Sequence, residues 1–178
     1  MNFEPMETRR LALRRFRAED CQIVHEYMSS PAVTAYLPDG QFSEDQAREL
    51  VSEGTSDYEE AIAVMLKEEN ALIGHMLFHP WFAPHTYEIG WVFHTRYHGR
   101  GFATEAAFAL LKFGFETLKL HRVVATCQPE NIASVRVMEK LGMRREGHFQ
   151  KCLHLSGERW WDEYFYAMLE EEWFAAQA

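Results

Sequence analysis

A short glycine-containing segment constrains this chain more than any other feature. Between the strand-like run Tyr87–Phe93 and the helix-like run Ala103–Leu118 lies the segment Arg96-Tyr97-His98-Gly99-Arg100-Gly101-Phe102-Ala103-Thr104. Two glycines two residues apart leave backbone N–H groups accessible, and the following helix adds unpaired amides and the positive end of its dipole. The segment therefore predicts an anion site. The forked guanidinium groups of Arg96 and Arg100 favour a diphosphate over a carboxylate.

Two common phosphate loops do not fit this segment. A dinucleotide fingerprint needs a third glycine where the chain has Thr104, and an acidic residue at the end of a following strand about 20 residues on. A P-loop needs Gly-Lys-Ser/Thr, which the sequence lacks. What remains is Arg-x-x-Gly-x-Gly between a strand and a helix. The pattern alone also fits an ordinary glycine-rich turn.

Length and composition set the outer bounds. The 178 residues are 47% hydrophobic and 14% aromatic, which predicts one domain, 1–178, with a sizeable core. Without an apolar run of about 18 residues or a signal-like N-terminus, we expect a cytoplasmic protein with no membrane span. A net charge of −9 argues against nucleic acid and favours a cationic substrate such as an amine. Cys21, Cys127 and Cys152 are odd in number and lack metal spacing, so we expect no metal.

Periodicity and turn residues predict alternating strands and helices. The expected strands are 10–16, 60–66, 71–78, 87–93, 122–127, 144–153 and 159–169, and the expected helices are 21–28, 43–53, 103–118 and 132–141. Roughly thirty residues with one helix join the fourth strand to the fifth, which predicts that these two are parallel. Ser156-Gly157 predicts the turn of the closing hairpin, and the tail 170–178 is expected to be helical or frayed. Ser43 with Gln46 predicts a capping box at a helix start. Loops are expected at Pro31 and Pro38-Asp39-Gly40, and between Pro80 and Pro84, where Trp81 and Phe82 lie.

Two motifs together resemble the GNAT superfamily, the acetyl-CoA-dependent N-acetyltransferases. Arg-x-x-Gly-x-Gly is similar to their pyrophosphate loop, and the run from Asn131 to Met143 is similar to their second motif, Asn-x-x-Ala/Ser followed by Lys-x-Gly-Phe or a near variant. The resemblance extends from Arg9 to the last strand. Ser134 matches the branch of Rim-type ribosomal-protein N-terminal alanine/serine acetyltransferases. The family resemblance implies an α/β fold. Its sheet is expected to be single, mixed and mostly antiparallel, with six to seven strands, a parallel fourth and fifth strand that splay apart, and about four flanking helices.

The resemblance also implies a set of acetyl-CoA contacts. The fourth strand is expected to offer backbone groups to the pantetheine arm and the thioester carbonyl, and the glycine segment is expected to hold the diphosphate. The implied contact residues are Trp91, Val92, Phe93, Arg96, His98, Gly99, Arg100, Gly101, Phe102, Ala103, Thr104, Asn131, Ser134 and Met138. Asn131 also suits the N-cap of the second motif's helix, and both roles are compatible.

Acetyl transfer to an amine requires a neutral amine, so a base is useful at neutral pH. Glu88 is our first candidate because it resembles the strand-four glutamate of some GNAT enzymes; a solvated or paired strand residue is the alternative. Weaker candidates are Asp162, Glu163, His75 and His79. The chain contains no recognisable Cys-His or Ser-His-Asp pattern, which fits direct attack without a covalent enzyme intermediate.

The proton donor departs from the common family pattern. Many members have a tyrosine where this chain has Met138, which cannot give up a proton. Ser134 is the remaining carrier of that role in the Rim-type branch, or else a helix hydroxyl that only contacts CoA. The glutamate that the Rim-type enzymes have in the closing hairpin is matched here by Leu153.

These observations predict an acyltransferase that moves an acetyl group from acetyl-CoA to a primary amine, with a protein N-terminal α-amine as the expected acceptor. One alternative acceptor is a small amine of the aminoglycoside, polyamine or amino acid type. Another alternative is a CoA-binding protein of this family without turnover. A monomer or a homodimer is expected.

Overall fold

The computed structural model describes residues 4–54, 61–155 and 158–177. Its strands are β1 Met6–Glu7, β2 Leu11–Arg14, β3 Ala61–Leu66, β4 Ala71–Pro80, β5 Thr86–Phe93, β6 Arg122–Cys127, β7 Arg144–His154 and β8 Trp160–Leu169. Its α-helices are α1 Cys21–Met28, α2 Pro31–Thr34, α3 Glu44–Glu53, α4 Phe102–Lys112, α5 Ile132–Lys140 and α6 Glu170–Ala175. Short 3₁₀ turns, Ala18–Asp20 and Thr95–Tyr97, precede α1 and follow β5, and the π-turn Phe113–Thr117 ends α4.

The eight strands form one sheet in the order β1-β2-β3-β4-β5-β6-β8-β7. Among the pairings of the described strands only β5 and β6 are parallel, and their register covers Thr86–Glu88 against Arg122–Val124. Both strands continue past this short register, to Phe93 and Cys127, so the pair separates after three residues as predicted. The mixed, mostly antiparallel sheet is confirmed, with eight strands where the sequence predicted six or seven.

Most predicted elements agree with the structure within two residues. The bounds of α1 and β6 are as expected, and Ser43 caps α3 because its side chain accepts from the Gln46 N–H in a reciprocal capping box. The predicted strand start at Glu60, the turn Ser156-Gly157 and the final residue Ala178 lie outside the described residues.

Two local predictions were wrong. Pro31 begins the short helix α2 instead of lying in a loop, because a proline at the first helical position loses no helical hydrogen bond. The predicted helix from Ala103 to Leu118 changes to a π-turn after Lys112, where the Leu118 N–H donates to the Phe113 carbonyl at 3.0 Å. The two-residue strand β1 was not predicted, since two residues show no periodicity.

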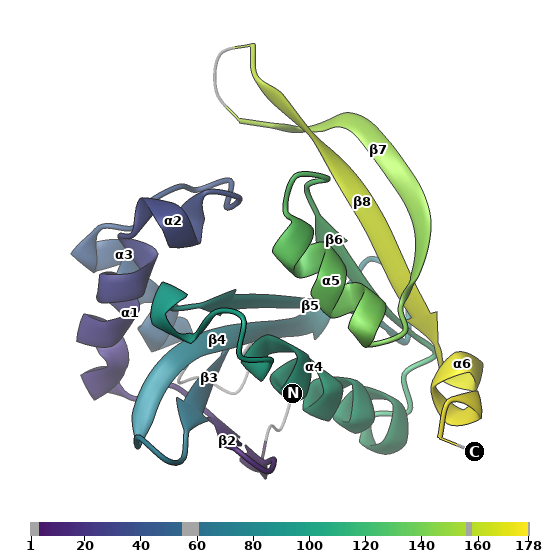
Figure 1. Cartoon of the computed structure of the whole chain (residues 1–178), viewed down its shortest axis with the longest axis horizontal. Helices are drawn as coiled ribbons and strands as arrows, with labels where there is room; N and C mark the ends of the chain where they lie inside the picture. The colour runs from purple at the N-terminus through teal and green to yellow at the C-terminus, as the bar shows by residue number, and fades with distance from the viewer. Residues whose placement is uncertain (1–3, 55–60, 156–157, 178) are drawn as a thin grey trace. The chain divides into compact units, whose positions relative to one another are not determined.

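The residue contacts group into two compact units, Met1–His79 with Trp91–Ala109, and Pro80–Gly90 with Leu110–Ala178. We describe each unit by itself, and the single domain expected from the sequence stays a prediction. In the first unit, β1 to β4 form an antiparallel meander. Helices α1 and α3 cover one face of it (Figure 1).

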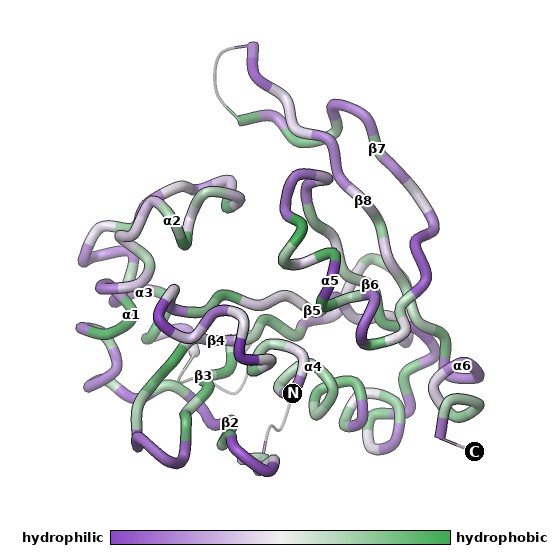
Figure 2. The backbone as a smooth tube through the Cα atoms, in the orientation of Figure 1, coloured by the Kyte–Doolittle hydropathy of each residue, from purple (hydrophilic) through white to green (hydrophobic). Residues whose placement is uncertain are grey.

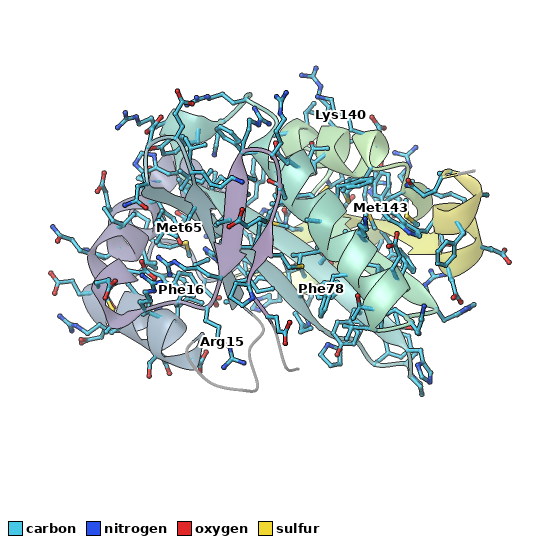
Figure 3. All side chains as sticks on the ribbon, turned by 90° about the horizontal axis from the view of Figure 1, so that it is seen from below. Arg15, Phe16, Met65, Phe78, Lys140 and Met143 are labelled. Carbon is cyan, nitrogen blue, oxygen red and sulfur yellow. The ribbon has the colours of Figure 1, made fainter. Side chains whose placement is uncertain are left out.

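The core of the first unit lies between these helices and the strands. Val24 and Tyr27 of α1 and Val51 of α3 pack with small strand residues such as Ala63. Phe16 is a member of this cluster, and Met65 packs against it; both are labelled in Figure 3. The hydropathy colours show β3 and β4 as mainly apolar and the segment that enters α4 as mainly hydrophilic (Figure 2).

The second unit contains the antiparallel strands β6, β8 and β7, with β5 beside β6 over the three-residue register. Strands β7 and β8 form a long hairpin (Figure 1). Gly142 follows α5 with φ +81°, the left-handed conformation that a glycine after a helix adopts readily. At the other end of this unit, Phe115 stacks on Trp173 of α6 at 5.7 Å between ring centroids.

Candidate acetyl-CoA and acceptor site

The predicted anion loop begins with a compact turn in the first unit. The Arg96 N–H donates to Nδ1 of His94 at 3.1 Å, and the amides of Tyr97 and His98 donate to the carbonyls of His94 and Thr95 at 2.9 and 3.1 Å. Because these three amides are used within the turn, the loop's anion-binding amides must come later. Gly99 is therefore where such a site can begin.

Gly99 and Gly101 both have left-handed backbone conformations, with φ of +73° and +80°. A residue with a Cβ is strained there, and this explains why both positions are glycine. Nothing lies within 4 Å of the point where a Cβ of Gly99 would be, so there is open space beside the loop. The backbone beside Gly99 is thus uncovered, as an anion site requires.

Helix α4 starts directly after this turn. The Glu105 N–H donates to the Gly101 carbonyl at 3.1 Å, which closes the first helical turn. The amides of Phe102, Ala103 and Thr104 belong to that first turn and have no partner within an α-helix. With the positive end of the helix dipole, they extend the anion-binding surface begun by the glycines.

The two arginines of the loop converge on a carboxylate that the sequence did not single out. Glu69, in the hairpin between β3 and β4, lies 3.6 Å from Arg96 and 3.8 Å from Arg100, measured between nitrogen and oxygen. The Tyr97 hydroxyl donates to the same carboxylate at 2.8 Å. Burial, followed by this hydrogen bond, raises the pKa of Tyr97. The diphosphate predicted as the partner of Arg96 and Arg100 would therefore share these arginines with Glu69.

A second unpredicted contact ties the start of α4 to the N-terminal strand region. Arg10 bonds Glu105 through Nε at 2.6 Å and through its backbone N–H at 2.9 Å, and Thr8 adds a hydroxyl at 2.6 Å. Although burial alone raises the pKa of Glu105, the bonds from Thr8 and Arg10 lower it below its usual value. Arg10 also donates to the carbonyl of Arg100 at 3.0 Å, so it supports the loop directly.

The end of β5 completes the first unit's part of the predicted site. Val92 and Phe93 are buried, and Trp91 is half-buried. The Phe93 carbonyl pairs with Nε2 of His98 at 2.8 Å, so this predicted contact residue holds the strand end through its ring. A Cβ on Gly74 of β4 would lie 2.3 Å from the Val92 carbonyl, which shows how closely the two strands approach.

The second predicted motif lies in the second unit and has the expected local structure. Asn131 is the N-cap of α5, and its side chain accepts from the Ser134 N–H at 3.2 Å. Ser134 is half-buried in the first turn of the helix. Met138, at the position where many family members have tyrosine, is fully buried.

Glu88 is one of two neighbouring carboxylates in the second unit. The Thr126 hydroxyl donates to Glu88 at 3.2 Å and also bonds Glu163 of β8. Burial raises the pKa of Glu163, the negative charge of Glu88 raises it further, and bonds from Cys152 and Thr126 oppose the rise. The structure thus brings the first base candidate together with a weaker one.

The remaining base candidates are His75, Asp162 and His79. His75 is buried in the first unit, where it bonds the Tyr27 hydroxyl at 2.8 Å. Asp162 accepts from the Lys151 N–H and pairs with His148, both at 2.8 Å. His79 lies near the C-terminal end of β4.

Thiolate chemistry is disfavoured at two of the three cysteines. Burial raises the pKa of Cys127 to about 12, and burial together with Glu163 raises that of Cys152. Over residues 4–54, 61–155 and 158–177, no group of three or more His, Cys, Asp or Glu side chains is arranged to hold a metal ion. Among the helices of these same ranges, none has the length and apolar character needed to cross a bilayer.

The sequence from residue 10 to residue 144 matches the family described as the acetyltransferase (GNAT) domain. This chain belongs to the GNAT acetyltransferases. It is 52% identical over 166 residues to the uncharacterized N-acetyltransferase YnaD of Bacillus subtilis, covering 93% of this chain and 97% of YnaD. The crystal structure of a GNAT-family acetyltransferase from Bacillus anthracis is 51% identical and superposes with a TM-score of 0.90, over 95% of this chain and 100% of that one.

A more distant relative has a named acceptor. The [ribosomal protein uS5]-alanine N-acetyltransferase of Escherichia coli is 27% identical over 89 residues, which cover 50% of this chain and 45% of that enzyme. Membership of the GNAT family confirms the predicted fold and the predicted acyltransferase class, with acetyl-CoA as the family's acetyl donor. Sequence reasoning missed Glu69, Arg10 and Thr126, because each acts through a partner distant in the sequence.

Proposed function

We propose that this GNAT enzyme acetylates the α-amine of a protein N-terminus. The observation that carries acetyl-CoA use is the loop itself: two left-handed glycines lead directly into α4, with open space beside Gly99. The diphosphate is assigned to the amides from Gly99 to Thr104, because the three preceding amides are used within the turn. Trp91, Val92 and Phe93 of β5 are assigned to the pantetheine arm and thioester carbonyl, and Asn131, the N-cap of α5, and Ser134 of α5 to contacts with the same cofactor. Met138 was expected among these contacts, but it has no exposed surface and is left out of the proposal.

The transfer we propose is direct. The amine nitrogen attacks the carbonyl carbon of the thioester, a C–N bond forms and the C–S bond breaks. Glu88 takes the proton that the amine loses, and Ser134 gives a proton to the departing sulfur and regains one from water. An α-amine titrates near ~7.7 to 8.0, against ~10.4 for a lysine-type amine, so the α-amine demands less of the base.

Two further observations support an N-terminal acceptor. Ser134 in Asn-x-x-Ser is the variant that resembles the ribosomal-protein branch. The Escherichia coli relative is named for acetylating the alanine of a ribosomal protein. A small polyamine is the second candidate, since a net charge of −9 attracts any cationic amine.

The test is acetyl transfer from labelled acetyl-CoA to four acceptors: peptides with free N-termini, the same peptides with blocked N-termini and a free lysine, spermidine, and an aminoglycoside. We expect label on the free N-termini only. Label only on spermidine or only on the aminoglycoside would mean that the acceptor is that small amine and not a protein N-terminus. Tight acetyl-CoA binding with no transfer to any amine would favour a CoA-binding protein without turnover.

A further inference from the structure

One face of the second unit's strands carries both acidic and aromatic side chains. The register pairs Thr126 of β6 with Phe165 of β8, and Phe149 of β7 with Glu163 of β8. Directly paired residues, and residues two apart on one strand, share a face of a sheet. Phe149, Glu163, Phe165 and Thr126 therefore share one face, and Glu88 joins them through its bond from Thr126.

The aromatic part of this face forms a groove. A cavity of about 470 Å³ is lined by Trp81 and Phe82 of the loop before β5 and by Phe149 and Phe165 of the hairpin. Trp81 lies 4.0 Å from Phe82 and 5.2 Å from Phe165 between ring centroids, and Phe149 lies 5.6 Å from Phe165. Phe82 is 83% exposed and Phe149 is 48% exposed, so this wall of the groove offers apolar surface to water.

The charged groups at the groove's margin are already paired. Arg122 and Glu146 form an ion pair with each other, and Glu146 also bonds Arg144. Thr126 bonds the carboxylates of both Glu88 and Glu163, and burial, followed by the negative charge of Glu88, raises the pKa of Glu163. A positive charge beside Glu88 and Glu163 would relieve their repulsion. The face thus complements a cation at one end and an apolar group at the other.

The strand register sets the distance between the cationic group and the apolar group of a ligand that binds this face. Directly paired strand residues have Cβ atoms roughly 5 Å apart, so the Phe149 wall begins about one side-chain width from Glu163. In an N-terminal residue, the α-amine is two bonds from Cβ. The α-amine of a residue with a large apolar side chain therefore matches the distance between the acidic pair and the groove.

We propose that the groove formed by Trp81, Phe82, Phe149 and Phe165 receives the first side chain of the acceptor peptide and selects large apolar residues. The inference rests on the proposed function and names the substrate class within it. The groove, at about 470 Å³, has more room than one ring needs, which suits a first side chain followed by more chain.

The test compares peptides that differ only in the first residue: Phe, Leu, Ala or Ser. We expect kcat/KM to be roughly tenfold higher for Phe-first and Leu-first peptides, the size of discrimination that apolar pockets achieve. Phe82→Ala and Phe149→Ala should each remove most of this preference, by lowering kcat/KM for Phe-first and Leu-first peptides far more than for Ala-first peptides. Both side chains are well exposed, so truncating them should leave the fold intact. Phe174→Ala, on α6 and 44% exposed, is the matched control and should keep the preference.

Calorimetric binding of the same peptides with CoA present gives a second readout that needs no turnover. If no amine is acetylated, the proposed function fails. The groove would still be supported if the wild-type protein binds Phe-first peptides and Phe149→Ala abolishes that binding. Equal or better use of Ala-first and Ser-first peptides, with no difference in binding, would overturn the inference. Acetylation of free phenethylamine as fast as of the Phe-first peptide would overturn it in favour of a small aralkylamine. A wild-type dimer that Phe82→Ala converts to monomers would overturn it in favour of a second copy on this face.

Discussion

The loop of the first unit and the open face of the second unit are built in opposite ways. In the loop, the shape comes from the backbone: two glycines, a compact turn and a helix start, all within nine consecutive residues. On the face, the chemistry comes from side chains of β5, β6, β7 and β8, which the register brings together. We propose that this backbone site binds the diphosphate of acetyl-CoA, the donor that all members of the family use. A side-chain face is where one enzyme can differ from its relatives.

The largest expected effect is a loss of turnover when Glu88, on the side-chain face of the second unit, is changed. Glu88→Gln should lower turnover about 1000-fold at neutral pH, since a positioned base contributes roughly 10² to 10⁴. The pH at which turnover is half-maximal should rise toward the range of the free amine, and affinity for acetyl-CoA should not change. Stopped-flow rates from pH 5.5 to 9 with an α-amine peptide measure this.

Glu163→Gln is the matched variant for that experiment. Burial and the charge of Glu88 raise the pKa of Glu163, so Glu163 keeps its proton to a higher pH than an exposed glutamate does. We expect a smaller loss than for Glu88→Gln. A larger loss would transfer the base role to Glu163, and an unchanged profile for both variants would remove the pair from the chemistry.

The second effect is a loss of stability at low pH, caused by a buried histidine of the first unit. Burial lowers the pKa of His75 to about 4, below the value near ~6.5 of an exposed histidine. The unfolded chain therefore takes up this proton first, so the stabilising contribution is complete above about pH 6.5 and is lost as the pH falls toward about 4. A difference of this size corresponds to about 3 kcal/mol of unfolding free energy.

Urea unfolding at pH 7, 5.5 and 4.5 checks the prediction, with the double variant Tyr27→Phe/His75→Leu as control. The double variant removes both partners of the buried bond and should show a flatter dependence on pH. Proton uptake by His75 near pH 6.5 in the folded protein, followed by NMR, would contradict the prediction.

The same contrast explains what the sequence could predict. The loop glycines, the Asn131 cap of α5 and the Ser43 capping box are local patterns, so each was found from neighbouring residues. Glu69 lies about 27 to 31 positions before the arginines that it faces, and Thr126 lies 38 positions after Glu88. Such pairs depend on register and packing, which no local pattern encodes.

The aromatic groove was missed for the same reason. Trp81 and Phe82 were seen only as part of a loop between prolines, and Phe149 and Phe165 as strand residues. Their rings meet because of the β7/β8 register, whose shifts between Arg145 and Gly147 and between Phe149 and Leu153 are not evident from alternation alone. Register irregularities move side chains from one face to the other, so a strand prediction does not give a face.

The third effect tests the backbone character of the loop. Gly101→Val should weaken acetyl-CoA binding about 30-fold, or about 2 kcal/mol, because φ of +80° disfavours a β-branched residue and the added side chain crowds the diphosphate. The melting temperature should fall by only a few degrees, since the backbone strain costs about 1–2 kcal/mol and Gly101 is exposed. Calorimetry with acetyl-CoA measures the affinity, and an unchanged value would remove the loop from the diphosphate site.

The fourth effect separates turnover from binding at α5. Ser134→Ala should lower turnover about tenfold and leave acetyl-CoA affinity within about twofold, because the thiol of CoA, with a pKa near ~8.5, leaves with little help. The Asn131 cap survives, since it uses the Ser134 backbone N–H. Single-turnover rates give the comparison. A drop in affinity without a drop in rate would make Ser134 a binding residue only.

The smallest effect is expected at Glu69, where the two kinds of site meet: a side-chain carboxylate faces the arginines of a backbone-built loop. Glu69→Gln should tighten acetyl-CoA binding about threefold at low salt, because it removes a negative charge that competes with the diphosphate for Arg96 and Arg100. The gain is small because exposed ion pairs contribute little, and it should shrink as salt is added. Glu68→Gln, one residue earlier in the same hairpin, is the control and should change affinity less. Weaker binding by Glu69→Gln would mean that the carboxylate and the Tyr97 hydroxyl serve mainly to hold the arginines in position, and the loop would then depend on side chains as much as the face does.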